Sequence, residues 1–161
     1  MATEIGEYVV GACLKLLKLC DFVDYNVRRP GGGLAGLNEI DVVGLDFKNN
    51  TAYLCEVTTH LDGLLYKDAP TTVERVRKKY QRLKDYAKDF LVDFPNRHFM
   101  FWSPVVRESV ANELKKISGL ELVVNKDYTA YVRLLQELAK RGTHDTGNPT
   151  FRVLQILEHL R

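Results

Sequence analysis

Apolar residues recur along the chain at two different spacings, which predict an alternation of helices and strands. Near the start, Ile5, Val9, Ala12, Cys13 and Leu16 follow one another at three- and four-residue intervals. Such spacing is typical of the buried face of a helix. Short runs rich in β-branched and aromatic residues, bounded by Gly, Pro or Asn, predict strands between the helical segments.

The predicted elements follow the order αβββαβαβαα. Helices are expected over about 3–19, 71–90, 107–117, 128–141 and 150–161. Strands are expected over about 22–27, 39–47, 51–59, 98–103 and 120–124. The later strand–helix–strand connection implies a parallel pair of strands. We therefore expect an α/β fold, with a mixed central sheet flanked by helices on both faces.

Length and composition fit one folded domain. A chain of 161 residues supports a single sizeable core. Contents of 45% hydrophobic and 27% charged residues are typical of globular proteins rather than disordered ones. The three cysteines form no CxxC pair, no secretory segment precedes them, and no apolar run approaches the ~20 residues of a membrane span. We expect a cytoplasmic, intracellular protein with no membrane partner.

The segment RRPGGGLAGLN, residues 28–38, predicts a loop, because its glycines and proline fit neither a helix nor a strand. No GK[ST] motif follows it, and it lacks the strand-before, helix-after placement of a nucleotide-binding loop, so we exclude that kind of site. Arg28 and Arg29 make the loop basic where it begins.

Each strand of the predicted hairpin carries an acid, Asp41 in the first and Glu56 in the second. A symmetric loop centred on Asn49 and Asn50 would place Asp41 opposite Thr58. All three of Asp41, Glu56 and Thr58 then project from one face of the sheet. Asp41 and Glu56 become diagonal neighbours, with Cα atoms ~7–8 Å apart. A loop of three or five residues would instead put the two acids on opposite faces.

Two carboxylates on a mostly apolar sheet are costly to desolvate. A divalent cation between Asp41 and Glu56 removes this conflict, and oxygen ligands suit Mg²⁺ or Mn²⁺ better than zinc. Such an ion can hold a phosphodiester, lower the pKa of a bound water and stabilise charge on the leaving oxygen. The alternative is that both are ordinary strand acids, neutralised by Lys or Arg.

The segments GLNEIDVVGLD and AYLCEVTTH resemble the core of the PD-(D/E)xK nuclease superfamily. Members have a restriction-endonuclease-like fold, with an aspartate on one hairpin strand and an ExK tripeptide on the next. The resemblance covers about residues 4–124 of a single domain, 1–161, and leaves a helical C-terminal extension at about 127–161.

The resemblance implies metal-dependent hydrolysis of phosphodiesters, with Asp41 and Glu56 as Mg²⁺ ligands. The carbonyl of Val57 would be a third ligand. Glu7, on the first predicted helix, resembles a helix carboxylate that some members add to the metal site.

At the position of the superfamily's lysine this chain has Thr58, so its tripeptide is EVT. In the superfamily that lysine orients or helps to deprotonate the attacking water. A threonine hydroxyl can hold a water by hydrogen bonds but carries no charge. His60 shares the face of Thr58 and is a candidate base. Polar side chains that the following helix could supply are Lys78, our catalytic candidate, Lys79, Gln81 and Arg82.

The helix predicted at 71–90 is basic, with seven Lys or Arg against three acids, in a chain whose net charge is only +2. We expect it to contact phosphates. The nucleic-acid-binding residues that we predict are Arg28, Arg29, Arg75, Lys78, Lys79, Gln81 and Arg82. The alternative is a solvated helix face without a ligand.

Together these patterns predict a Mg²⁺- or Mn²⁺-dependent nuclease that acts on DNA, and a homodimer would suit cleavage of both strands. Two other functions remain open. The first is a nuclease-fold binding or assembly subunit, inactive because Thr58 stands at the lysine position. The second is an unrelated α/β domain that forms protein interfaces through its C-terminal helices.

Overall fold

The computed structural model describes residues 2–31 and 38–161. Within these ranges the helices are α1 (Ile5–Leu16), α2 (Ala69–Phe90), α3 (Glu108–Leu114), α4 (Lys126–Arg141) and α5 (Pro149–Glu158). The strands are β1 (Phe22–Val27), β2 (Ile40–Asp46), β3 (Thr51–Val57), β4 (Asn96–Ser103) and β5 (Leu120–Val124). The order αβββαβαβαα is therefore confirmed. Of the predicted glycine-rich loop, residues 32–37 lie outside the described residues.

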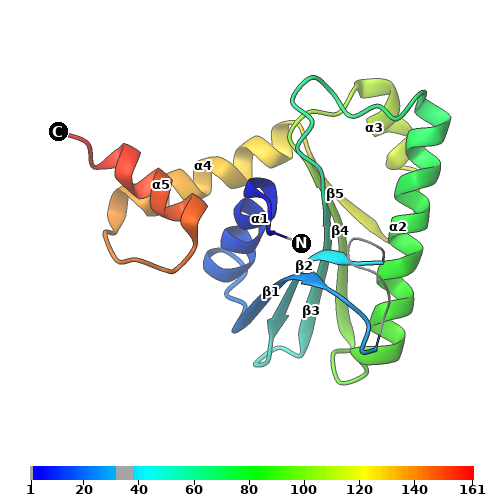
Figure 1. Ribbon diagram of the computed structural model, residues 1–161, viewed down its shortest axis with the longest axis horizontal. Coiled ribbons are helices and arrows are strands. Elements are labelled where there is room, and N and C mark those ends of the chain that lie inside the picture. Colours follow the sequence, from blue (N-terminus) through cyan, green and yellow to red (C-terminus); the bar gives the residue numbers. More distant parts are fainter. Residues whose placement is uncertain (1, 32–37) are drawn as a thin grey trace.

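The strands form one mixed sheet in the order β1-β2-β3-β4-β5. β2 runs antiparallel to both β1 and β3, whereas β3, β4 and β5 are parallel to one another. In Figure 1, α1 lies on one side of the sheet, and α2 and α3 lie on the other. The predicted mixed α/β sheet with helices on both faces is confirmed.

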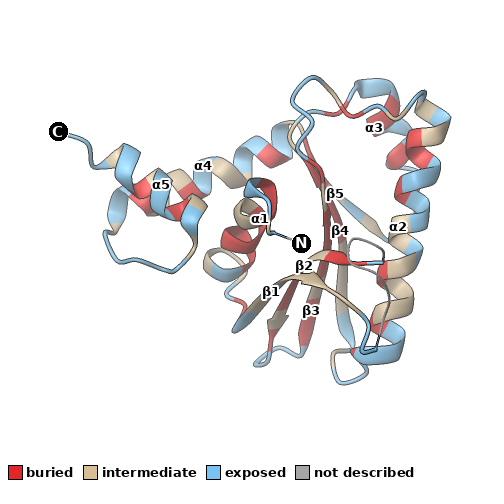
Figure 2. Cartoon of the chain, viewed as in Figure 1, coloured by how far each residue is buried: buried red, intermediate tan, exposed pale blue. Residues whose placement is uncertain are grey.

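Each face of the sheet carries its own core. On the α1 side, Val42, Cys55 and Trp102 pack together with apolar residues of α1, α4 and α5. On the α2 side, Leu54 and Phe101 belong to two further clusters that include the inner face of α2. Figure 2 shows α2 buried along the side that faces the sheet and exposed along much of its outer surface. The charged residues of α2 therefore lie on its outer side and along its flanks.

α1 packs very closely on the sheet, at positions where it has glycine. A Cβ added at Gly11 would overlap the hydroxyl of Tyr25 in β1, and one added at Gly6 would overlap the methyl group of Thr59. A larger residue at either position would force the helix or its neighbour to move. The N-terminal turn of α1 is thereby held beside the end of β3.

α2 begins before the range predicted from the sequence. Its N-cap is Asp68, whose carboxylate accepts a hydrogen bond of 2.8 Å from the backbone N–H of Thr71. Pro70 fits the first turn because backbone N–H groups there have no partner within the helix. The connection from β3 to α2 therefore spans residues 58–68.

The hairpin between β2 and β3 corrects the predicted register. Asp46 pairs with Thr51, so the loop between them has four residues. Asp46 stabilises this turn, because its carboxylate accepts hydrogen bonds from the backbone and side-chain nitrogens of Asn49, at 3.0 and 2.6 Å. The centre of the loop lies one residue earlier than predicted, and each pairing therefore shifts by two residues.

The predicted pairing of Asp41 with Thr58 is therefore wrong, although the two acids share a face as expected. The last pair in the ladder is Val42 with Cys55, and one further step places Asp41 directly opposite Glu56. A shift of two residues leaves every side chain on the same face. The acids are direct rather than diagonal neighbours.

α4 and α5 form the C-terminal part of the structure, where α5 packs against α4 and α1. Phe151 and Gln155 are the buried residues of α5. Among the described residues, no helix combines the length and the hydrophobicity needed to cross a membrane.

Candidate active site

A hollow of about 440 Å³ opens where α1, β2, β3 and α2 meet. Its lining is rich in carboxylates, which belong to Glu4, Glu7, Glu39, Asp41 and Glu56. The basic side chains that line it are those of Lys79 and Arg82, both from α2. Val57, Thr58, His60 and Tyr66 also contribute to its wall. Carboxylates so close together repel one another, and nearby cations stabilise their ionised forms.

Asp41 is held in place by the strand beside it. Its Oδ2 accepts a hydrogen bond of 2.7 Å from the backbone N–H of Val57, the residue after Glu56. The bond fixes the Asp41 carboxylate at the carboxyl end of β3. Asp41 is partly exposed, so it remains accessible from the hollow.

Glu56 is the most buried acid of the hollow, with a side chain that is 3% exposed. Its Oε2 lies 2.8 Å from Nζ of Lys79. Its Oε1 is buried and has no hydrogen-bond partner among the described residues. Burial raises the pKa of Glu56 to about 7; the charge of Lys79 opposes this shift, and the charge of Asp41 adds to it.

Lys79 supplies the cation nearest to the paired acids. Burial disfavours its charged form, but attraction to Glu56 and Asp41 outweighs this effect, and the pKa of Lys79 is raised above the usual value of 10.5. Lys79 is therefore protonated at neutral pH. The positive charge beside Glu56 thus comes from α2.

Thr58 is held by one backbone contact and by one side-chain contact that a lysine could not make. Its backbone N–H donates to the carbonyl of Trp102 at 2.9 Å, and its buried hydroxyl lies 2.9 Å from the hydroxyl of Ser103 in β4. His60 is exposed at the rim of the hollow, where its ring meets the ring of Tyr66 edge to face, with centroids 5.9 Å apart. Thr58 and His60 thus both line the hollow, but the Thr58 hydroxyl is already hydrogen-bonded.

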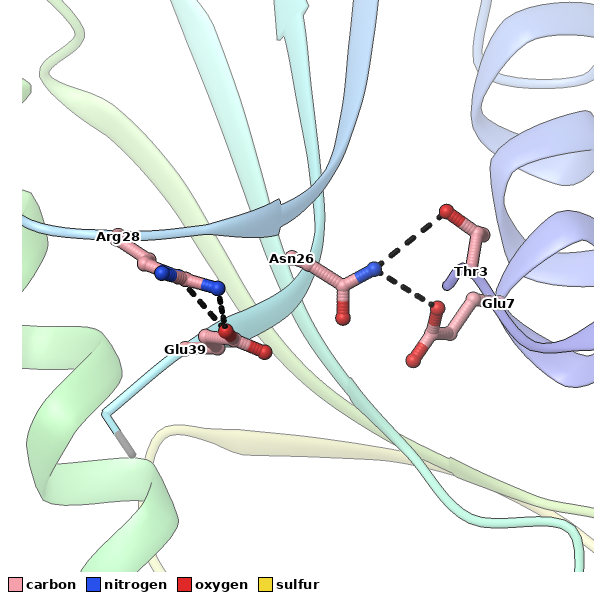
Figure 3. Close-up of polar contacts among 5 residues, drawn as sticks. All are labelled: Thr3, Glu7, Asn26, Arg28 and Glu39. Atoms are coloured by element: carbon pink, nitrogen blue, oxygen red, sulfur yellow. Dashed lines mark hydrogen bonds and ion pairs between the residues drawn. The ribbon is translucent and has the colours of Figure 1, made fainter. Parts of the chain in front are cut away.

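Glu7 reaches the hollow from α1 (Figure 3). Its Oε2 accepts hydrogen bonds from the backbone N–H of Glu4 at 2.9 Å and from Nδ2 of Asn26 at 3.4 Å. Asn26 also reaches Oγ1 of Thr3 at 3.4 Å and so links β1 to the start of α1. Burial raises the pKa of Glu7, these hydrogen bonds oppose the shift, and the charge of Asp41 adds to it.

Arg28 and Arg29, both predicted to contact nucleic acid, are engaged within the protein. Arg28 Nη2 lies 2.6 Å from Oε1 of the buried Glu39 (Figure 3). Arg29 Nη2 lies 3.3 Å from Oδ2 of Asp89, and its guanidinium stands over the ring of Phe90. Ligand binding by either arginine would compete with these contacts.

Of the predicted residues of α2, Arg75, Lys78 and Gln81 do not line this hollow, whereas Lys79 and Arg82 do. Lys78 is exposed and lines a second hollow of about 370 Å³, which it shares with Arg75, Tyr66, Lys79 and Arg82. Gln81 is exposed, and its amide donates to Asp85 at 2.9 Å. We conclude that Lys79, rather than the predicted catalytic candidate Lys78, reaches Glu56.

Sequence reasoning missed several lining residues, above all Glu39 and Tyr66. Glu39 is two residues before Asp41, so strand alternation could have placed it on the same face. Tyr66 lies in the loop between β3 and α2, where no periodicity indicates direction. Ser103 belongs to a different strand from Thr58 and becomes its neighbour only through the β3–β4 pairing.

The donor set of the hollow fits a hard cation with few protein ligands. Among the described residues, no group of three or more His, Cys, Asp or Glu is arranged to hold a metal ion. Mg²⁺, however, commonly binds through one or two carboxylates and keeps several waters. Asp41 and Glu56 supply two carboxylates, and the unpartnered Oε1 of Glu56 is a free acceptor in the interior.

Comparison with known proteins adds no family to this description, since no family model, no curated protein and no solved structure matches the chain.

Proposed function

We propose that this protein is a Mg²⁺- or Mn²⁺-dependent nuclease that hydrolyses phosphodiester bonds, with DNA as its substrate. The observation that carries the proposal is the buried Glu56 carboxylate, which has one oxygen on Lys79 and the other without a partner among the described residues. Buried polar groups are normally satisfied by hydrogen bonds. A free carboxylate oxygen beside Asp41 is instead suited to bind a cation.

The residues of the hollow have separate roles in this proposal. Asp41 and Glu56 would hold the ion, and the superfamily resemblance adds the carbonyl of Val57 as a third ligand and Glu7 as a further one. When bound, the ion lowers the pKa of a water and stabilises charge on the leaving oxygen. The backbone N–H of Val57 orients Asp41.

Lys79 has the role that the superfamily resemblance gives to the lysine of ExK. It orients the Glu56 carboxylate by donating to Oε2, and it places a positive charge where a phosphate would approach. The Thr58 hydroxyl donates its proton to Ser103 and can still accept a hydrogen bond from a water. His60, at the rim, is the candidate to accept the proton of the attacking water. Lys78 contributes to phosphate binding.

Cleavage of supercoiled DNA in Mg²⁺ tests the proposal. We expect nicking that stops in chelator and is abolished by Asp41→Asn and by Glu56→Gln. Lys79→Met should lower the rate by roughly 10²–10³-fold, the usual loss for a group that stabilises transition-state charge. Lys88→Met, in the exposed last turn of α2, is the matched control and should cleave like the wild type. Cleavage that persists in both acid variants would refute the assignment.

One observation favours a second function, a nucleic-acid-binding or assembly subunit without activity. The Thr58 hydroxyl is bonded to Ser103, and Lys79 already neutralises Glu56, so the hollow can be stable without an ion. This alternative predicts salt-dependent DNA binding, no cleavage in Mg²⁺ or Mn²⁺, and no effect of Asp41→Asn. An absence of DNA and RNA binding at low salt would favour the protein-interaction domain.

A further inference from the structure

Two hollows of opposite character share one wall. The hollow that contains Asp41 and Glu56 is acidic, whereas the neighbouring hollow of about 370 Å³ is lined by Arg75, Lys78, Lys79, Arg82 and Tyr66. Tyr66, Lys79 and Arg82 belong to both. The lining changes from acidic to basic where these three side chains stand. A nucleic acid strand whose phosphate enters the acidic hollow would therefore continue into the basic one.

Tyr66 is fixed at this boundary by its backbone. Its N–H donates to the hydroxyl of Thr72 at 2.8 Å, and Thr72 is fully buried in the first turns of α2. The Thr72 hydroxyl in turn donates to the carbonyl of Asp68 at 2.8 Å, and the N–H of Asp68 donates to the carbonyl of Tyr66. Tyr66 therefore has a set position relative to α2 although it lies in a loop.

The ring of Tyr66 has a cation over it. The Arg75 guanidinium carbon lies 4.5 Å from the ring centroid, and the ring of His60 meets that of Tyr66 edge to face. Arg75 has no carboxylate partner within 4 Å among the described ion pairs, so its donors remain available to a phosphate. Aromatic rings beside cations are the usual binding surface for single-stranded nucleic acids, where bases stack and the cations bind phosphates.

The spacing along α2 fits a strand that crosses from one hollow to the other. Arg75 and Lys79 are one helical turn apart, a rise of roughly 6 Å, which is the scale of one nucleotide. Lys79 forms an ion pair with Glu56, and the Arg75 guanidinium lies over the ring of Tyr66. The phosphate next to the one that is cut would thus lie near Arg75 and Lys78, with its base beside Tyr66.

We propose that Tyr66 and Arg75 form a subsite for the nucleotide next to the scissile phosphate, and that its base is unpaired and stacks on Tyr66. The inference rests on the proposed nuclease function and names its substrate class, a nucleic acid with a single-stranded segment at the cut, such as a flap or a branch. A base within a duplex is covered by its neighbours and cannot stack on a protein ring unless it is extruded.

Fluorescence of 2-aminopurine tests the subsite without cleavage. Single-stranded oligonucleotides and flap substrates carrying this base beside the junction are titrated with the protein in chelator, and stacking on Tyr66 should quench the signal. Tyr66→Leu should remove the quenching and weaken binding of the flap about five- to hundredfold, the range expected for one lost base–aromatic stack. Tyr66→Phe should restore both, since the ring is kept. Binding of a blunt duplex of the same length should change less than about twofold.

Equal losses for flap and duplex in Tyr66→Leu, or quenching that survives this substitution, would overturn the subsite. Asp41→Asn separates this failure from failure of the nuclease proposal, because it should keep the quenching while it abolishes Mg²⁺-dependent cleavage. Tyr66-dependent quenching without any cleavage would retain the subsite and reject the nuclease. Cleavage of flaps and duplexes at equal rates in the wild type and in Tyr66→Leu would retain the nuclease and reject the subsite.

Discussion

The carboxylate of Glu56 is in a position where an ionised group is unfavourable, and the fold neutralises it only in part. Lys79 satisfies one oxygen at 2.8 Å, and the other oxygen has no partner among the described residues. Burial of an isolated carboxylate favours its protonated form. A glutamine could accept the same hydrogen bond from Lys79 without a buried negative charge, and this agrees with our proposal that the acid at this position binds a cation.

Glu56 should therefore make the stability of the fold fall as the pH rises. Its pKa is raised from 4.5 to about 7 in the folded protein, so over this interval the folded state keeps a proton that the unfolded chain has released. Stability present below about pH 4.5 should be lost progressively up to about pH 7, by roughly 3 kcal/mol at most. In Glu56→Gln this pH dependence should disappear.

Urea unfolding in chelator at several pH values measures this effect. The relevant quantity is the difference in unfolding free energy between the wild type and Glu56→Gln, which should shift in favour of the variant as the pH rises. A difference that is constant with pH would show that folding does not raise the pKa of Glu56, and it would contradict the effect of burial on this carboxylate.

The sequence does not show which of Lys78 and Lys79 contacts Glu56. Neighbouring lysines on one helix both fall on its polar side, and the sequence analysis favoured Lys78. Which of them reaches the sheet depends on the rotation of α2, which is set by the packing of Val76 and Leu83 against the strands. That rotation depends on tertiary packing and is not readable from helical periodicity.

Among the elements, the β2–β3 hairpin has a different register from the predicted one, yet Asp41 and Glu56 still lie on the same face of the sheet. The sequence analysis placed the loop centre one residue too late, because it did not anticipate that Asp46 would bind Asn49 within the turn. Strand alternation has a period of two residues, so a two-residue shift changed the partners and kept the faces. The common face of Asp41 and Glu56 followed from parity, whereas their direct opposition did not.

The contact between α1 and β1 gives a prediction at the scale of elements. Gly11→Ala would ordinarily favour the interior of a helix by about 1 kcal/mol. Here the added methyl group would overlap the hydroxyl of Tyr25, which is partly buried. We expect a net loss of stability of about 1–3 kcal/mol, as for other overpacked sites.

Thermal unfolding of Gly11→Ala and of a matched control, Gly142→Ala, checks this packing. At Gly142 the nearest atom to an added Cβ is the carbonyl oxygen of Leu138 at 3.9 Å, so its effect should stay within about 0.5 kcal/mol. A Gly11→Ala protein that is as stable as the wild type would contradict the close approach of α1 to the sheet.

For the whole molecule, the order of elements and the mixed sheet were predictable because they follow from local periodicity and from the preference for parallel crossovers. The strand Leu120–Val124 was predicted with the same ends that it has in the structure. Helix ends were less accurate, since caps such as Asp68 act through single hydrogen bonds. The wall shared by the two hollows was not predictable, because Tyr66 reaches it through the buried hydroxyl of Thr72.

In the proposed function, Asp41 and Glu56 hold a single divalent cation between them. A crystal soaked in Mn²⁺, with anomalous scattering recorded near the manganese edge, tests it most directly. We predict a peak in contact with both carboxylates, absent in crystals of Asp41→Asn. If Mn²⁺ at concentrations that saturate other sites leaves no peak there, and Glu56 remains bound only to Lys79, these carboxylates do not form a cation site.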